Sequence, residues 1–306
     1  MEKKHFIITI DTESDNQWNS LHGQTTENAK YIPRFQCLCE EFGFKPVYLV
    51  DYSMSQDQFL VDYLKRCNLR ETCEIGMHLH AWDTPPHHAY DDCSTARSYL
   101  IEYPEDTMRN KIATMHHRLT DVFECKIVSH RAGRWATNDA YFDLLSEFGY
   151  KVDCSYTPGI SWNRSPGATT GGSDYSMMLD EISCVGSKAS MMEVPMTLKK
   201  VHRMIKPQRG VDLVKEPIKY IKGRYWWLRP ALSNNKMMME VLDGRKQNYA
   251  EFMMHSSEMM PGGSPYFKTE EDIDRLYTNL QQFFSEISKD YIGTTLCEYC
   301  QLYGES

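Results

Sequence analysis

The sequence predicts an α/β fold in which parallel strands alternate with helices and close into a TIM-like (β/α) barrel of about seven strands. Seven short apolar or β-branched runs recur along the 306 residues, and most are nearly continuous rather than alternating. This pattern is typical of parallel strands that are covered on both faces. Helical patterns lie between several of the runs, as an alternating α/β architecture requires. The predicted strands span residues 5–11, 46–51, 73–78, 126–131, 150–155, 192–197 and 251–256.

Helices are predicted from apolar residues near helical spacing and from the signals at their ends. The first helical segment stops before Gly43, a common C-terminal cap. Pro104 and the acidic residues after it suit a first turn. Thr137 is the expected N-cap of the fourth helix, and Thr269 that of the last. The predicted helices span residues 27–42, 58–69, 104–123, 138–148 and 270–289.

Every predicted strand delivers a polar or ionisable residue at its carboxyl end. Barrel enzymes build their active sites at that face from several different strands, whereas a doubly wound sheet converges on fewer. This difference favours the barrel. The strand-end residues are Asp11, Glu13, Asp51, His78, His80, His130, Arg131, Asp153, Thr197 and His255.

Two stretches interrupt the strand–helix alternation. Residues 156–190 are rich in Gly, Ser, Thr and Pro and are too long for an ordinary connection. Residues 199–248 begin with a basic segment that contains two adjacent tryptophans, Trp226 and Trp227. We expect both stretches to be insertions over the carboxyl-terminal face of one domain that spans residues 1–306.

The overall charge argues against binding to a nucleic acid, but one basic segment suits another anionic partner. The formal net charge is −8, which argues against a nucleic-acid-binding protein. Residues 199–229, however, hold ten Lys and Arg against two acidic residues. This segment suits an acidic or phosphate-bearing glycan, and its tryptophans and lysines also suit a peripheral contact with anionic lipid. The alternative is a solvated basic helix whose long side chains cover apolar surface.

Several features together predict a cytoplasmic protein. The first residues include lysines but no apolar stretch of the kind found in signal peptides. No window approaches the ~18 consecutive apolar residues of a membrane span. The ten cysteines are scattered, as expected of free thiols in a reducing compartment. The sequence does not set the oligomeric state.

The stretch 74–86 carries the most specific chemistry. His78 and His80 are two residues apart at the end of a strand, so their side chains are expected to emerge on the same side. Asp11 and Glu13 follow the first strand with the same spacing. Two histidines and one carboxylate, with a fourth position left to water, form a common catalytic zinc arrangement.

Two further strand ends complete a candidate hydrolase site. Arg131 is expected to hold Asp11 ionised and oriented. His255 comes from the last strand and is expected to face this set as a general acid for the leaving group. Such a set suits metal-assisted hydrolysis of an amide or ester. The alternative is that these are ordinary polar strand ends, solvated at the rim of a barrel.

Four short motifs in order resemble those of the polysaccharide deacetylases with a NodB-homology domain, carbohydrate esterase family 4, and most closely the WbmS-like branch. The motifs are TIDTE at 9–13, EIGMHLH at 74–80, HRAGRW at 130–135 and MHSSE at 254–258. The resemblance implies a deformed (β/α)7 barrel. It implies that Asp11 is the catalytic base, oriented by Arg131, and that His255 is the acid. It also implies that the metal ligands are Glu13, His78 and His80.

The chain departs from the family pattern at three points. Thr12 stands where many relatives have a second carboxylate, and the arginine motif lacks its usual proline. The family places its two histidines four residues apart, whereas here that position is Trp82 and the second histidine is His80. Asp83 is therefore a second candidate for the third ligand.

The function predicted is removal of N- or O-linked acetyl groups from a sugar or a surface-polysaccharide intermediate, which the basic segment suggests is anionic or phosphate-linked. The expected cofactor is a divalent metal, most simply zinc, with cobalt, nickel, manganese or iron as alternatives. Two other functions stay open. One is an amidase that acts on a small cyclic molecule, and the other is a glycan-binding protein without catalytic activity. The expected substrate-binding residues are Trp82, Asp83, Arg134, Trp135, Asp153 and Ser256.

Overall fold

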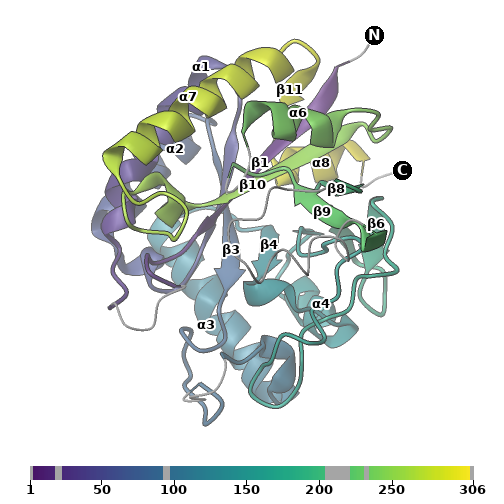
Figure 1. Ribbon diagram of the computed structural model, residues 1–306. Helices are drawn as coiled ribbons and strands as arrows, with labels where there is room; N and C mark the ends of the chain where they lie inside the picture. The colour runs from purple at the N-terminus through teal and green to yellow at the C-terminus, as the bar shows by residue number, and fades with distance from the viewer. Residues whose placement is uncertain (1–2, 18–22, 92–96, 204–220, 231–233, 304–306) are drawn as a thin grey trace.

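The computed structural model describes residues 3–17, 23–91, 97–203, 221–230 and 234–303, and it contains a curled parallel sheet with helices around its outer face (Figure 1). All seven predicted strands are present, and all neighbours in this part of the sheet are parallel. This is the deformed (β/α)7 barrel that the sequence predicts. In spatial order the strands are β10 (Tyr249–His255), β1 (Lys4–Thr12), β2 (Pro46–Val50), β3 (Glu74–Leu79), β4 (Ser129–Ala132), β5 (Val152–Asp153) and β7 (Met191–Glu193).

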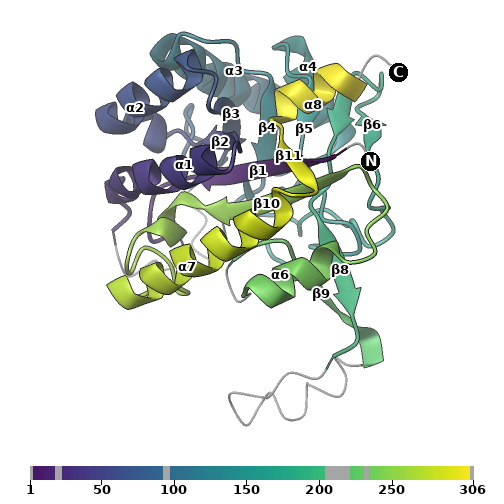
Figure 2. The same cartoon turned by 90° about the horizontal axis from the view of Figure 1, so that it is seen from above.

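Four short strands extend this sheet or stand beside it. β6 (Ser183–Val185) pairs antiparallel with β7, and β11 (Tyr291–Gly293) pairs with the start of β1. β8 (Leu198–Val201) and β9 (Arg224–Trp227) form a separate antiparallel pair. This pair contacts helix α6 (Asn235–Leu242) and projects from the body of the molecule (Figure 2).

The helices agree with the predicted segments, with two corrections at their N-termini. The first segment begins as a 3-10 helix, η1 (Glu27–Tyr31). The α-helix starts only at Ile32, just before a proline, which is favoured in the first turn of an α-helix. The N-cap of the fourth helix is Asn138 and not Thr137, since the Asn138 side chain accepts from the backbone of Tyr141. Thr269 caps the last predicted helix as expected. The α-helices are α1 (Ile32–Glu41), α2 (Gln58–Leu69), α3 (Glu105–Phe123), α4 (Asp139–Glu147), α6, α7 (Glu270–Ile287) and α8 (Leu296–Tyr303).

Strand alternation divides each strand between the helices and the barrel interior. On β1, Phe6, Ile8 and Ile10 belong to the core between the sheet and the outer helices, where Phe6 meets Phe283 of α7 at a ring-centroid distance of 6.0 Å. The intervening Ile7 belongs to a second core inside the barrel. Successive side chains of a strand point to opposite faces, so Thr9 and then Asp11 continue the inward row.

The barrel interior changes from apolar to polar along the strands. Its amino-terminal half is filled by the second core, which α8 closes with Leu296 and Tyr299. The backbone N–H of Cys297 donates to Glu74 at the start of β3, and this bond fixes α8 at that end. The polar strand ends are therefore accessible only from the carboxyl-terminal face of the barrel. The inward apolar residues of the strands in this core are Ile7, Val47, Leu49, Val152, Met192 and Tyr249.

The seam between β7 and β10 is closed by single residues rather than by a strand pair. The Leu228 N–H donates to the Thr197 carbonyl at 3.0 Å, and the Met253 N–H donates to the Leu228 carbonyl at 3.1 Å. The Thr197 hydroxyl accepts from the Glu251 N–H at 2.9 Å. Leu228, from within the predicted 199–248 insertion, thus takes part in closing the barrel.

The two predicted insertions contact each other beside the carboxyl ends of the strands. Trp227 lies edge-on to Trp135, with ring centroids 5.5 Å apart, and Trp162 of the other insertion lies 6.4 Å from Trp227. Trp226 is 7 % exposed and packs in the core, so burial removes it from the predicted membrane contact. Much of the basic segment, 204–220, lies outside the described residues. Among the described residues, no helix has the length and apolar character needed to cross a bilayer.

We predict that Thr197→Val lowers the free energy of unfolding by about 1–3 kcal/mol, because the buried Glu251 N–H loses its acceptor. Thr197→Ser, which keeps the hydroxyl, is expected to lose less. Urea unfolding followed by circular dichroism measures both. A Thr197→Val protein as stable as the wild type would show that the seam does not depend on this bond.

Candidate active site

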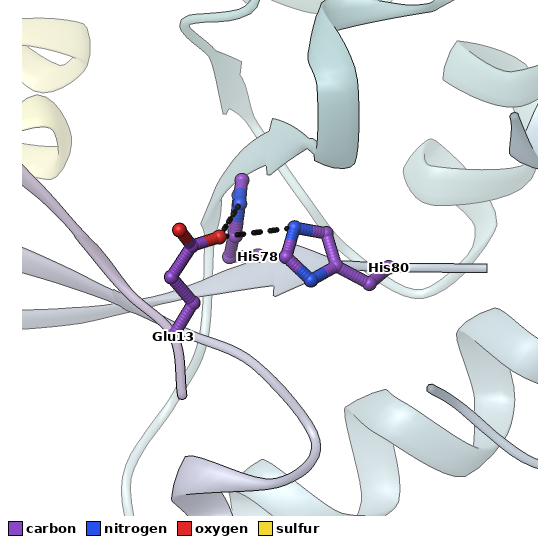
Figure 3. Close-up of side chains that lie close together, drawn as sticks. All are labelled: Glu13, His78 and His80. Atoms are coloured by element: carbon purple, nitrogen blue, oxygen red, sulfur yellow. Dashed lines mark ion pairs between the residues drawn. The ribbon is translucent and has the colours of Figure 1, made fainter. Parts of the chain in front are cut away.

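Three side chains from β1 and β3 converge at the carboxyl end of the barrel. Glu13 follows β1, while His78 lies on β3 and His80 directly follows it (Figure 3). The Glu13 Oε2 atom lies 3.6 Å from His78 Nε2 and 3.2 Å from His80 Nε2. All three residues are buried, and one ligand atom from each lies within 4.8 Å of the others. This group could bind one metal ion.

The Nε2 atoms of both histidines face Glu13, and the surrounding residues leave them able to bind a metal. His78 Nδ1 lies 3.1 Å from the Arg131 carbonyl, which can only accept, so Nδ1 carries the hydrogen and the Nε2 lone pair faces Glu13. His80 Nδ1 has no hydrogen-bond partner among the described residues and lies 4.0 Å from Asp51 Oδ2. The Asn28 amide and the Ser256 hydroxyl both donate to the Glu13 carbonyl. This two-nitrogen, one-oxygen donor set fits zinc and related metals.

Electrostatics favour a neutral ring at His80. Burial, and then the neighbouring His78, hold the pKa of His80 well below its usual value. Neutral imidazole is the form that donates a lone pair to a metal. The His80 ring is also stacked on Trp82, with centroids 4.5 Å apart and an interplanar angle of 18°.

Arg131 connects the candidate base to the barrel interior. Its Nη1 donates to Asp11 Oδ1 at 2.6 Å, its Nη2 bonds Thr9 and Glu251, and its Nε donates to the Cys154 carbonyl at 3.1 Å. Burial alone would raise the pKa of Asp11, but Arg131, His78 and His255 together outweigh it, so the pKa lies below its usual value. Asp11 is therefore an oriented, ionised carboxylate, as expected from the sequence.

His255 reaches the same place from β10. Its Nε2 lies 3.8 Å from both Asp11 Oδ2 and Glu13 Oε1. Its Nδ1 lies 3.3 Å from Arg229 Nη2, and Arg229 is itself paired with Glu258 at 2.5 Å. An arginine can only donate, so Nδ1 accepts and Nε2 carries a hydrogen toward the carboxylates. His255 is thus positioned to donate a proton.

These groups line a cavity of about 270 Å³. Three of the predicted substrate-binding residues, Trp82, Arg134 and Trp135, are part of its wall, whereas Asp83, Asp153 and Ser256 are not. The sequence analysis singled out neither Gln17 nor Arg97, which also line it. The lining residues are Asp11, Glu13, Gln17, His78, His80, Trp82, Arg97, Arg134, Trp135 and His255.

The three residues outside the cavity wall have structural partners. Strand alternation turns Asp153 to the outer face of β5, where it bonds His130 Nδ1 at 2.5 Å. Asp83 accepts from the backbone N–H and the hydroxyl of Ser53, so Glu13 and not Asp83 joins the two histidines. Ser256 supports Glu13 through its backbone.

Four further polar residues at the site were not assigned a role there from the sequence. Asp51 ends a predicted strand, so its position was available as a signal. Gln17, Arg97 and Arg229 lie outside any predicted strand or helix, and no periodic pattern could have placed them in the site.

Comparisons with known proteins support the fold. No protein-family description and no curated protein matches the chain. A candidate polysaccharide deacetylase from Mycobacterium smegmatis has a similar structure, with a TM-score of 0.55, 14 % identity, and coverage of 99 % of this chain and 92 % of that one. The 4-α-glucanotransferase from Thermococcus litoralis has a TM-score of 0.56 and 13 % identity, with coverage of 99 % and 41 %.

A family 4 carbohydrate esterase from Streptomyces lividans, solved in complex with acetate, matches more loosely. Its TM-score is 0.46 at 8 % identity, with coverage of 95 % of this chain and 91 % of that one. We draw no conclusion about this protein from a match with a TM-score below 0.5. At 13–14 % identity the two stronger matches show a shared fold, and activity has to be argued from the site itself.

We predict that Gly133→Ala lowers the affinity for Zn²⁺ by about tenfold or more, as disturbed supports of metal ligands do. A methyl group at Gly133 would overlap the His80 ring and the Leu79 carbonyl. Gly23→Ala is the matched control, because a methyl group there meets nothing within 4 Å. Isothermal titration calorimetry measures both affinities. Unchanged affinity in Gly133→Ala would argue against His80 as a ligand.

Proposed function

We propose that this protein is a metal-dependent carbohydrate deacetylase of the carbohydrate esterase family 4 kind. It would remove N- or O-linked acetyl groups from a sugar or a surface-polysaccharide intermediate, as in the WbmS-like branch. The observation that carries the proposal is the convergence of Asp11 and His255 on the buried Glu13–His78–His80 group at one cavity. The fold alone does not carry it, because a glucanotransferase shares that fold.

The cofactor proposed is a divalent metal held by Glu13, His78 and His80. Zinc suits the donor set best, and cobalt, nickel, manganese or iron are alternatives. When bound, such an ion supplies Lewis-acid activation of water and of an acyl oxygen.

The side chains around this group suit hydrolysis of an acetyl linkage. Asp11, kept ionised by Arg131, accepts the proton of the attacking water. The water oxygen bonds the acetyl carbon, and the bond from that carbon to the sugar nitrogen or oxygen breaks. His255 donates the Nε2 proton to the departing atom and regains at Nε2 the proton that Asp11 accepted, 3.8 Å away. Acetic acid, which ionises to acetate, and a free amine or hydroxyl are the products. Arg131 is a positioning residue in this scheme.

The cavity wall suits a sugar. Trp82 and Trp135 contribute aromatic surface to the cavity wall beside the reacting groups, and such surface packs well against the apolar side of a sugar ring. Arg134 adds a cation to the same wall. The acetylated sugar or glycan precursor is thus proposed to lie between these residues with its acetyl group toward Asp11.

Substitutions separate metal binding from catalysis. We predict that Glu13→Gln and His78→Ala each lose the stoichiometric metal and the release of acetate from acetylated sugars. Asp11→Asn is expected to keep the metal and to lose about 10²- to 10⁴-fold in rate, because only the base is removed. Elemental analysis and an acetate assay measure the two properties, and His117→Ala on the exposed face of α3 is the control.

Two results would overturn the proposal. One is a purified protein that binds no divalent metal yet hydrolyses a small cyclic amide, which would favour the amidase named above as an alternative. The other is sugar affinity that survives Asp11→Asn with no acetate released under any metal, which would favour a glycan-binding protein.

A further inference from the structure

Two arginines line the candidate active site without a carboxylate partner. Arg97 and Arg134 share the cavity wall with Glu13, His80 and His255. Both are partly buried, and neither forms an ion pair with any carboxylate among the described residues. The arginines behind the cavity wall differ in this respect, since Arg131 is paired with Asp11 and Arg229 with Glu258.

Arg97 is held by neutral groups close to the proposed metal ligands. Its guanidinium lies over the Trp82 ring, 4.8 Å from the centroid, and its Nη1 donates to Gln17 Oε1 at 2.8 Å. Trp82 is also stacked on His80. Arg97 therefore contacts the same indole ring as a proposed metal ligand.

Arg134 is fixed by the backbone as well as by its side chain. Its guanidinium lies over Tyr99 at 4.1 Å and donates to the carbonyls of Arg97 and Pro166. Arg134 and Trp135 have φ angles of 59° and 65°, two consecutive non-glycine residues in the left-handed region. Residues rarely adopt this conformation without a compensating function or surrounding structure. The arginine is thus held at the cavity wall at a backbone cost.

The acidic groups nearest to this pair are already engaged. Glu13 is a proposed metal ligand, and Asp83 accepts two hydrogen bonds from Ser53. The Glu102 carboxylate accepts from the backbone N–H groups of residues 168–170. Burial lowers the pKa of both Arg97 and Arg134, yet a guanidinium stays charged at neutral pH. Two positive charges therefore face the cavity without a carboxylate in ion-pair contact among the described residues.

We propose that Arg97 and Arg134 form an anion subsite that binds a carboxylate or phosphate group of the acetylated substrate. Guanidinium groups bind both oxyanions through paired hydrogen bonds, and a partly buried position strengthens those bonds. The substrate class is then an acetylated sugar that carries a negative charge close to the acetyl group. The identity of that substrate rests on the proposed function, whereas binding of the anion does not.

Binding of four small sugars to the metal-loaded protein tests the subsite by calorimetry. N-acetylglucosamine is the neutral probe, its 1-phosphate and 6-phosphate carry phosphate, and N-acetylmuramic acid carries a carboxylate. At least one anionic sugar is expected to bind about tenfold or more tighter than the neutral one, as charge-assisted hydrogen bonds provide. Its affinity is expected to fall as salt is raised. Which probe gains affinity tells phosphate from carboxylate.

Variants assign that preference to the two arginines. Arg97→Gln and Arg134→Gln are each expected to lower the ratio of the affinity for the anionic sugar to the affinity for N-acetylglucosamine by about tenfold. Arg134→Lys keeps the charge without the paired geometry and is expected to fall between. Arg275→Gln, whose exposed side chain pairs with Asp272 on α7, is the control. Melting temperatures establish that each variant is folded.

The outcomes distinguish this proposal from the proposed function. If no anionic sugar binds tighter than N-acetylglucosamine, or if the preference survives both glutamine variants, the subsite is overturned even when acetate is released. If the preference depends on the arginines but no acetylated sugar is hydrolysed, the subsite stands and the deacetylase assignment fails.

Discussion

The buried guanidinium of Arg131 is the interaction around which the polar half of the barrel is arranged. It bonds Asp11 and Thr9 on β1, Glu251 on β10 and the Cys154 carbonyl beyond β5. Removing one partner of such a buried pair typically costs about 3–5 kcal/mol, because the other charge remains without compensation. The same contacts that hold these strand ends together therefore fix the orientation of the candidate base.

The alternation of side chains along the strands converts this arrangement into a site. Inward positions carry the apolar core at one end and the charged groups at the other, and α8 closes the apolar end. The two-residue spacing of His78 and His80 matches the strand period, so both rings reach Glu13. A spacing that departs from the resembled family thus still produces a convergent ligand set.

The sequence predicted the fold and the centre of the site because both follow from strand periodicity. The seven strands and the grouping of Glu13 with His78 and His80 needed only local patterns and a shared barrel face. The same reasoning did not consider which face a residue occupies, and strand alternation turns Asp153 away from the cavity and toward His130. Arg97 comes from a connection without periodicity, so only the folded chain brings it beside Trp82.

The most direct test of this account is anomalous diffraction at the zinc edge from crystals of the protein soaked in zinc chloride. The account predicts one strong peak in the cavity at about 2.0–2.2 Å from nitrogens of His78 and His80 and an oxygen of Glu13. An ion bound instead by Asp51 or Asp83, or no ion in the cavity at all, would contradict it.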